Sequence, residues 1–272
     1  MTFLRWAGTL TALVVLIFTL SSCDITNSSD SDSEPELDLV TIGSVTSGDY
    51  TISLESDSML ETGVNQLYWK IEQDGNLISP GSITITPLMD MGDMMHSTPF
   101  QQPEVAPEDD RYFSNMAVFI MASGSMGSWS IGFDITLPNQ EVLIGEIPVE
   151  VNSSWRLTSV RDDEDNIYFI TWMHPRQPVT GNNTLAFMVH TRESMMSFPP
   201  VVDAELEIYP YMDMGGGSGH STEFTAPDAQ EAGYYEGSIN YSMSGTWTTS
   251  VSLTAGDVTL PEVMFEYSVQ AQ

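Results

Sequence analysis

The chain contains one long segment twice, and this duplication limits the folds that it can adopt. Residues 86–103 and 209–227 share a Pro, a Met-Asp-Met-Gly run, a His-Ser-Thr run and a Phe…Pro pair, with one extra residue before the second His. The likeness extends upstream, from 63–67 to 181–185, and downstream, from 127–129 to 245–247. A period of about 120 residues has the size of a whole domain, so the sequence predicts two tandem domains rather than a solenoid.

Each copy has the pattern of an all-β domain. Short runs of alternating or β-branched residues are separated by Gly, Pro, Asn and Asp, and no window shows a convincing helical period. About seven short strands in about 110 residues favour an immunoglobulin-like antiparallel β-sandwich, with Trp129 and Trp247 as core residues that open a strand. The expected strands are 50–54, 67–71, 82–86, 116–121, 130–137 and 142–151, and then 167–172, 185–189, 204–209, 237–243, 248–253 and 258–269.

The N-terminus has the pattern of a secretion signal. Arg5 precedes an apolar stretch, 7–20, that is too short to cross a hydrocarbon core of about 30 Å comfortably. The Leu-Ser-Ser-Cys run that ends at Cys23 resembles the lipobox of bacterial lipoproteins, in which the Cys carries the lipid and becomes the new N-terminus. Cys23 is the only Cys of the chain, which excludes an intramolecular disulfide. The alternative is an ordinary signal peptide followed by an incidental Cys.

These features predict a lipid-anchored protein of the cell envelope, on the periplasmic or cell-surface side, bound to the membrane through its N-terminal anchor. Residues 24–38 are rich in Ser, Asp and Glu and have few large apolar groups, as expected of a solvated tether. The expected organisation is a lipoprotein signal peptide at 1–22, the lipidated Cys with an acidic tether at 23–42, and two β-sandwiches at 43–152 and 153–272.

Charge and motifs exclude several classes of function. With 38 acidic against 7 basic residues, the formal net charge is −31 at pH 7, which repels phosphate backbones and excludes nucleic-acid binding. The sequence lacks the signatures of hydrolases, phosphate-binding loops, zinc proteases and dinucleotide-binding enzymes, so we expect no enzyme. The dense carboxylates also fit adaptation to high salt, in which case the charge says nothing about a ligand.

The order of the motifs resembles the YtkA-like/FixH-like domain. It comprises a Gly-x-Asn opening at 63–65 and 181–183, the Met-rich loop with its His, and a Met-x-Gly-x-Trp strand at 243–247. In the first copy, Met121 and Met126 are both candidates for the equivalent Met. That family consists of small periplasmic β-sandwiches in membrane-associated proteins linked to copper handling or oxidase assembly, and the resemblance implies this fold and setting for both copies.

The Met-rich loop predicts a site for a soft metal. Alternate side chains of an extended segment share a face, so the two Met of each Met-Asp-Met run point the same way, and the following Gly lets the chain turn back toward the His. Thioethers and imidazole suit Cu(I), and a thioether needs no deprotonation to bind it. The predicted ligands are Met89, Met91, Met94, Met95 and His96 in the first copy, and Met212, Met214 and His220 in the second.

A structural role is the alternative for the same residues, because Met fills irregular gaps in cores and a His can cap a loop. Met173–His174 and the Met188/His190 pair are weaker candidates of the same kind, whereas Met116 and Met195–Met196 are expected to pack. The acidic runs 108–110 and 162–165 are expected to be solvated, with loose binding of a divalent cation as the alternative.

The expected function is binding of Cu(I) for buffering or delivery, with solvent-accessible ligands that exchange one by one with those of a metalloprotein or oxidase partner. We expect substitution of Met89, Met91 or His96 to lower Cu(I) affinity more than substitution of Met116 or Met188. One alternative is a non-enzymatic surface or periplasmic lipoprotein whose Met and aromatic loops bind a protein or glycan partner. The other is an accessory subunit in oxidase assembly.

Overall fold

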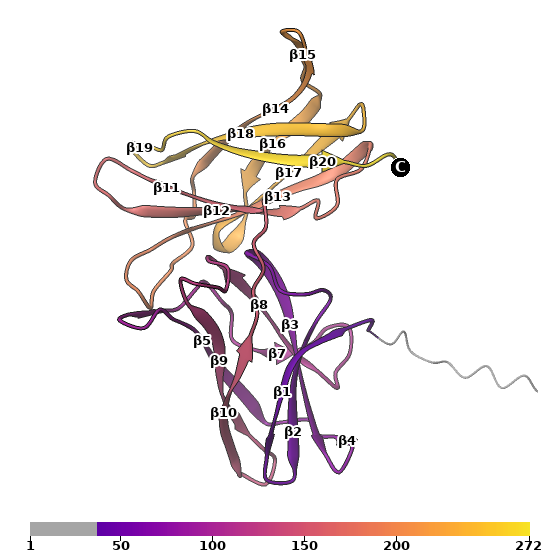
Figure 1. The fold of residues 1–272 in the computed structure, drawn as a ribbon, viewed down its shortest axis with the longest axis vertical. Helices are drawn as coiled ribbons and strands as arrows, with labels where there is room; N and C mark the ends of the chain where they lie inside the picture. The colour runs from indigo at the N-terminus through magenta and orange to yellow at the C-terminus, as the bar shows by residue number, and fades with distance from the viewer. Residues whose placement is uncertain (1–36) are drawn as a thin grey trace, which may run out of the picture. The chain divides into compact units, whose positions relative to one another are not determined.

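The computed structural model describes residues 37–272, which form antiparallel sheets paired into two sandwiches (Figure 1). We name β1–β10 the N-sandwich and β11–β20 the C-sandwich. The prediction of an all-β chain with tandem immunoglobulin-like sandwiches is confirmed. The expected signal peptide, Cys23 and the tether as far as residue 36 lie outside the described residues. Within 37–272, no helix is long and apolar enough to cross a membrane.

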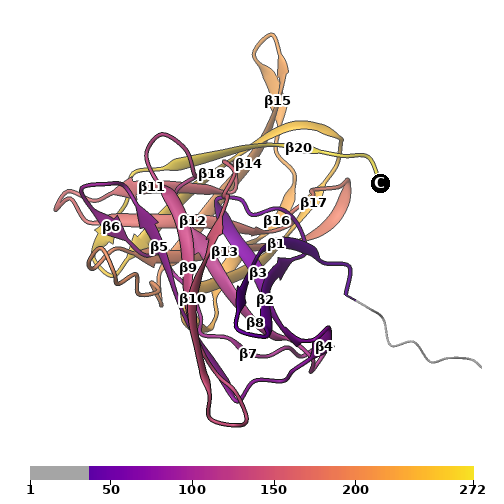
Figure 2. The same cartoon turned by 60° about the horizontal axis from the view of Figure 1, so that its bottom comes forward.

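The N-sandwich packs a sheet of order β1-β2-β3-β8-β7, with β4 beside β3, against a sheet of order β10-β9-β5-β6 (Figure 2). Its core lies between these sheets and includes the fully buried Trp69, Phe119 and Trp129. The strands are β1 Val40–Ser47, β2 Tyr50–Ser56, β3 Gly63–Gln73, β4 Asn76–Leu77, β5 Ser82–Asp90, β6 Met95–His96, β7 Glu104–Val105, β8 Phe113–Phe119, β9 Ser128–Thr136 and β10 Val142–Val149.

The C-sandwich repeats this topology. A sheet of order β11-β12-β13-β17-β16 faces one of order β15-β14-β18-β19, in which β20 also pairs with β18. Trp172, Tyr241 and Trp247 are buried in its core. The elements are β11 Leu157–Arg161, β12 Ile167–His174, β13 Gly181–Thr191, β14 Glu205–Gly215, β15 Ser218–His220, β16 Glu223–Ala229, the single-turn 3₁₀ helix Glu231–Gly233, β17 Tyr234–Tyr241, β18 Gly245–Ala255, β19 Val258–Thr259 and β20 Val263–Val269.

The structure differs from the expected strands mainly at the sheet edges. Strand β1 begins at Val40, so residues 40–42 of the expected tether are strand, where Ile42 packs against the core. Strands β11 and β16 were not expected, because an edge strand has one neighbour and exposes polar side chains that blur the alternation. The expected strand 258–269 is two strands, β19 and β20, with Pro261 between them.

The Gly-x-Asn motif is a side-chain clamp at the start of the third strand of each sandwich. The Asn65 side chain accepts a hydrogen bond from the Glu61 backbone N–H at 3.0 Å and donates to the carbonyls of Glu61 and Gly63 at 2.7 and 2.8 Å. The Asn183 side chain makes the same three bonds, with Val179 and Gly181 at 3.2, 2.8 and 2.9 Å. The motif thus satisfies backbone groups at the point where the chain enters the strand.

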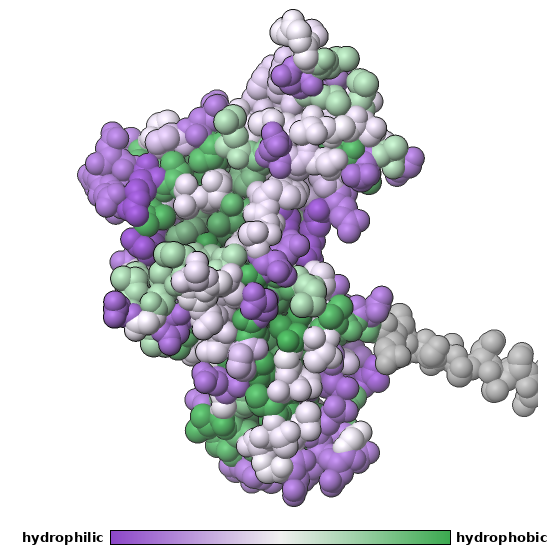
Figure 3. Space-filling model, in the orientation of Figure 1, coloured by the Kyte–Doolittle hydropathy of each residue, from purple (hydrophilic) through white to green (hydrophobic). Residues whose placement is uncertain are grey.

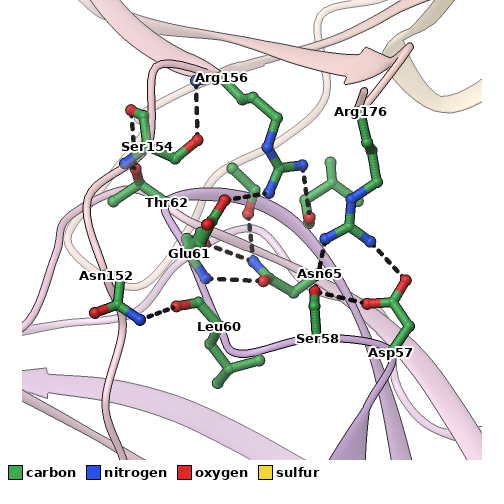
Figure 4. Close-up of polar contacts among 12 residues, drawn as sticks. Asp57, Ser58, Leu60, Glu61, Thr62, Asn65, Asn152, Ser154, Arg156 and Arg176 are labelled. Carbon is green, nitrogen blue, oxygen red and sulfur yellow. Dashed lines mark hydrogen bonds and ion pairs between the residues drawn. The ribbon is translucent and has the colours of Figure 1, made fainter. Parts of the chain in front are cut away.

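Two arginines join the sandwiches at one side of their junction (Figure 4). The guanidinium of Arg156, which is 3% exposed, donates to Glu61 at 3.1 Å, and that of Arg176 donates to Asp57 at 2.5 Å. Burial lowers the pKa of Arg156 and the nearby Arg176 lowers it further, whereas Glu61 opposes both effects. The junction therefore holds a buried cation whose partner comes from the other sandwich.

The backbone between the sandwiches is fixed at the same place. Asn152 and Thr62 are joined by a hydrogen bond from the Thr62 N–H to the Asn152 carbonyl at 2.8 Å, and the Ser154 N–H donates to the Thr62 hydroxyl at 2.8 Å. These bonds pair the connecting segment with a loop of the N-sandwich, so it is not a free linker.

Candidate metal centre

The Met-rich loops are hairpins, β5–β6 in the N-sandwich and β14–β15 in the C-sandwich. Met89 lies opposite His96 in the first hairpin, and Met212 lies opposite His220 in the second. The Asp of each motif points outward and its carboxylate accepts the backbone N–H two residues later at 2.8 Å, which closes the turn. Each hairpin therefore places a thioether next to an imidazole on neighbouring strands.

The structure splits the predicted ligands of the first copy. Met89 is fully buried in the core and Met91 is partly buried against it, whereas Met94 and Met95 are 51% and 50% exposed. His96 is 4% exposed. The expectation that all these ligands are solvent-accessible is therefore wrong for Met89 and His96, because alternation turns this face of β5 toward the core rather than toward solvent.

The second copy is more open. Met212 is partly buried against the core, Met214 is 59% exposed, and His220 is partly exposed. Residues 215–219, at the tip of this hairpin, are Gly-rich and contribute no sulfur. Only Met212 and His220 of the predicted ligands are therefore paired across the hairpin, whereas Met214 lies on its solvent-exposed part.

The two histidines have the same hydrogen bonds and hence the same tautomer. Nδ1 of His96 lies 2.7 Å from the Ser97 carbonyl oxygen, and Nδ1 of His220 lies 2.9 Å from that of Ser221. A carbonyl oxygen only accepts, so Nδ1 must carry the hydrogen in the neutral ring and Nε2 must carry the lone pair. Both Nε2 atoms are buried and have no hydrogen-bond partner within residues 37–272.

Each imidazole also packs edge-on against a Trp near the start of another strand of the same sheet, β9 or β18. The ring centroids of His96 and Trp129 are 5.3 Å apart at 89°, and those of His220 and Trp247 are 5.3 Å apart at 87°. Both tryptophans are buried, which confirms their prediction as core residues. Strand pairing places Met89 between His96 and Trp129, so the three side chains form one row across β6, β5 and β9.

A glycine two residues before each Trp lies against the hairpin, a feature that sequence reasoning missed. A Cβ on Gly127 would lie 2.6 Å from the Asp90 carbonyl oxygen and 3.0 Å from the methyl carbon of Met89, and one on Gly245 would lie 2.4 Å from the methyl carbon of Met212. The structure also resolves the choice between two methionines. The Trp129 indole N–H donates to the Met121 carbonyl at 2.9 Å, as Trp247 does to Met243 at 3.0 Å, so Met121 is the equivalent residue.

The Thr two residues after each His ties the hairpin to the opposite sheet. The hydroxyls of Thr98 and Thr222 donate to the carbonyls of Val118 and Asn240, respectively. Part of the duplicated motif therefore has a structural task. This task does not involve Nε2, because it uses the threonine hydroxyl and the Nδ1 side of the ring.

The remaining candidates lie elsewhere. His174 is exposed, His190 and Met188 are buried at the junction, and Met196 is exposed. In the 162–165 run, the side chain of Asn166 and backbone N–H groups lower the pKa of Asp162, which caps its own turn. Within residues 37–272 there is no group of three or more His, Cys, Asp and Glu side chains suited to a metal ion.

Comparisons with known proteins give one family match and several distant structural likenesses. The YtkA-like family matches residues 162–252, which lie in the C-sandwich. No curated protein matches the chain. Among solved structures, it is similar to domains 5–6 of the S-layer protein SbsC (12% identity, 86% of this chain and 98% of that one, TM-score 0.30), to the Escherichia coli adhesin FdeC (10%, 82% and 65%, 0.27) and to a conserved domain protein from Bacillus anthracis (9%, 85% and 91%, 0.29). These likenesses are too distant to bear on function.

Proposed function

We propose that the chain is a non-enzymatic, lipid-anchored protein of the cell envelope that holds Cu(I) at two sites, one in each sandwich. The observation that carries this proposal is the repeated imidazole whose Nε2 lone pair is buried without a partner next to a cross-strand Met. A buried lone pair without a partner is costly in a folded protein. Metal-binding His commonly donates its other ring N–H to a backbone carbonyl, as both rings do here.

The donor set favours Cu(I) over divalent ions. Thioether sulfur and neutral imidazole nitrogen are soft or intermediate donors without charge, and they suit a monovalent soft ion. A divalent ion in the same buried place would need carboxylates to offset its charge. In the N-sandwich, the partly buried Met91 would be a third donor to the ion. The exposed Met94 and Met95 would bind the ion transiently as it moves between solvent and the buried pair.

A competition titration with a chromophoric Cu(I) chelator under anaerobic, reducing conditions tests the proposal. We expect one bound ion at each Met–His pair in wild type, and a loss of at least about tenfold in affinity at one of these sites for Met89→Leu or His96→Gln. Met212→Leu and His220→Gln should have the same effect at the other site. Met264→Leu, which alters a Met that is 68% exposed on β20, is the matched control and should leave the curve unchanged. Equal curves for all variants would contradict the proposal.

The anchor is a separate part of the proposal, and the sequence of residues 1–23 supports it. Cys23 would carry the lipid after removal of 1–22, and the acidic tether would hold the sandwiches away from the membrane. Labelling with a radioactive fatty acid should mark the wild-type protein and not Cys23→Ala. A labelled Cys23→Ala protein would exclude lipidation at this residue.

A second function has support from the exposed methionines. Met94 and Met95 on β5–β6 and Met214 on β14–β15 present flexible apolar side chains on hairpins, as adaptable contact surfaces do. The β14–β15 hairpin projects from the top of the molecule in Figure 1 and in Figure 3. This arrangement would suit a protein or glycan partner, including an oxidase under assembly. Partner binding that survives removal of copper and fails in Met94→Ser/Met95→Ser would favour this function.

The YtkA-like assignment extends to the N-sandwich as part of the same proposal. Its support is the shared topology, the Asn clamp, and the His, Met and Trp in the same register. On this basis the chain carries two domains of one family, with the boundary in the segment between β10 and β11.

A further inference from the structure

His190 is a buried histidine that the two Met–His pairs do not use. It lies on β13 and is 6% exposed, and its Nδ1 has no hydrogen-bond partner within residues 37–272. Met188, two residues earlier on the same strand, shares its face and is also 6% exposed. A thioether and an imidazole nitrogen thus lie on one face of one strand.

That face lines a pocket of about 150 Å³ between the sandwiches. The C-sandwich contributes Met188, His190 and Phe198, and the N-sandwich contributes Phe100 and Met116 from the opposite side. Two methionines and one histidine therefore line a space large enough for a dehydrated ion. The pocket is partly open to solvent, which gives the ion a route in. No acidic side chain is among the described residues that line it.

We propose that this pocket is a third soft-metal site, which takes Cu(I) through Nδ1 of His190 and the thioethers of Met188 and Met116. The uncharged donors disfavour Zn²⁺ and Ca²⁺, which need charged or more numerous ligands. Because Met116 comes from the other sandwich, an ion here links the two sandwiches. From the sequence alone, Met116 is expected to pack rather than to bind metal.

Burial supports the ligand role of the imidazole. It lowers the pKa of His190 to about 4, so the ring is neutral and able to coordinate at neutral pH. The third site is also chemically distinct from the paired sites, because it uses Nδ1, whereas His96 and His220 offer Nε2. It does not require the paired sites to bind metal.

The test is ¹⁵N and ¹³C NMR of the histidine rings and methionine methyl groups of the whole protein during titration with silver(I), a redox-inert ion with the preferences of Cu(I). We expect His190 to shift at Nδ1, together with the methyl groups of Met188 and Met116. The exposed His174 serves as the reference for weak surface binding, and His190 should shift at lower silver concentrations than His174 does.

Variants separate this proposal from that of the paired sites. His190→Gln should bind one ion fewer than wild type, and Met188→Leu, which keeps the apolar volume, should bind at the third site at least about tenfold more weakly. The double variant His96→Gln/His220→Gln should retain the His190 shift. An unchanged His190 ring at saturating silver, or equal numbers of bound ions in wild type and His190→Gln, would overturn the third site whatever the paired sites do.

Discussion

The two sandwiches share the row of His, Met and Trp but fill the core behind it differently. In the C-sandwich, Tyr267 bonds to Tyr241 at 2.8 Å and to Thr249 at 2.6 Å, so three buried hydroxyls satisfy one another. In the N-sandwich, the equivalent positions carry side chains without a polar group. Strand pairing makes Phe119 equivalent to Tyr241, Ile131 to Thr249, and Val149 to Tyr267. Packing against a particular core therefore does not account for the row, which is the same with either core.

The two sites also differ in how they are covered. In the N-sandwich, the Ser97 backbone N–H next to His96 donates to the Met195 carbonyl at 2.8 Å, so a loop of the C-sandwich contacts the site. The hairpin of His220 has a partly exposed ring and a Gly-rich turn. A loop of the C-sandwich thus contacts the hairpin of His96, whereas the ring of His220 is partly exposed. Under the proposed function, the first ion would be held more tightly and the second would exchange more readily.

The Asn clamps give the largest expected effect and test how alike the sandwiches are. Asn65→Ala and Asn183→Ala each remove three hydrogen bonds and leave buried backbone groups unpaired, so each should cost about 3 kcal/mol of stability. Urea unfolding of both variants measures this cost. Asn76→Ala, which alters an exposed Asn at the start of β4, is the control. A large loss in one sandwich and none in the other would break the equivalence.

High pH should weaken the C-sandwich through its buried tyrosines. Burial raises the pKa of Tyr267 to about 12 and also raises that of Tyr241. Unfolded tyrosine ionises near pH 10. The free energy of unfolding is therefore unaffected by this group below pH 10, and it falls by about 2–3 kcal/mol for Tyr267 as the pH rises from 10 to about 12. Unfolding midpoints between pH 9 and 12 measure this. Tyr267→Phe should lose less stability over this range, and an identical pH profile would reject the argument.

Tyr267→Phe at neutral pH should have a smaller effect. It removes the hydroxyl shared by Tyr241 and Thr249 and should cost about 1–2 kcal/mol in thermal or urea unfolding. The variant Tyr241→Phe/Thr249→Val/Tyr267→Phe gives the C-sandwich a hydrocarbon core like that of the N-sandwich. It should be closer to wild type than the single variant, because no hydroxyl is left unpaired. A triple variant with the summed losses of the single variants would contradict this view.

The sequence predicted the central strands well, because burial on one face makes their alternation strong, as at Ile83 and Ile85 in β5. The edge strand β16 was missed because most of its side chains are exposed and Pro227 lies within it. Alternation also predicted correctly that Asp90 points away from Met89 and Met91. It could not say which face meets the core, because that depends on the opposite sheet.

The tautomer and the burial of the imidazoles could not be predicted from the sequence for a similar reason. Which nitrogen of His96 carries the hydrogen depends on the position of the Ser97 carbonyl, and the cover of the ring depends on Met195, which is remote in the chain. The pocket at His190 likewise needs Met116 from the other sandwich. Contacts between distant segments set these features, and a periodic pattern in one segment carries no information on them.

X-ray absorption at the copper edge of the Cu(I)-loaded protein tests the central claim most directly. The account predicts a first shell of sulfur and nitrogen together, with less sulfur in Met89→Leu/Met212→Leu and less nitrogen in His96→Gln/His220→Gln. A shell of oxygen or nitrogen alone, or a spectrum that neither variant changes, would contradict it.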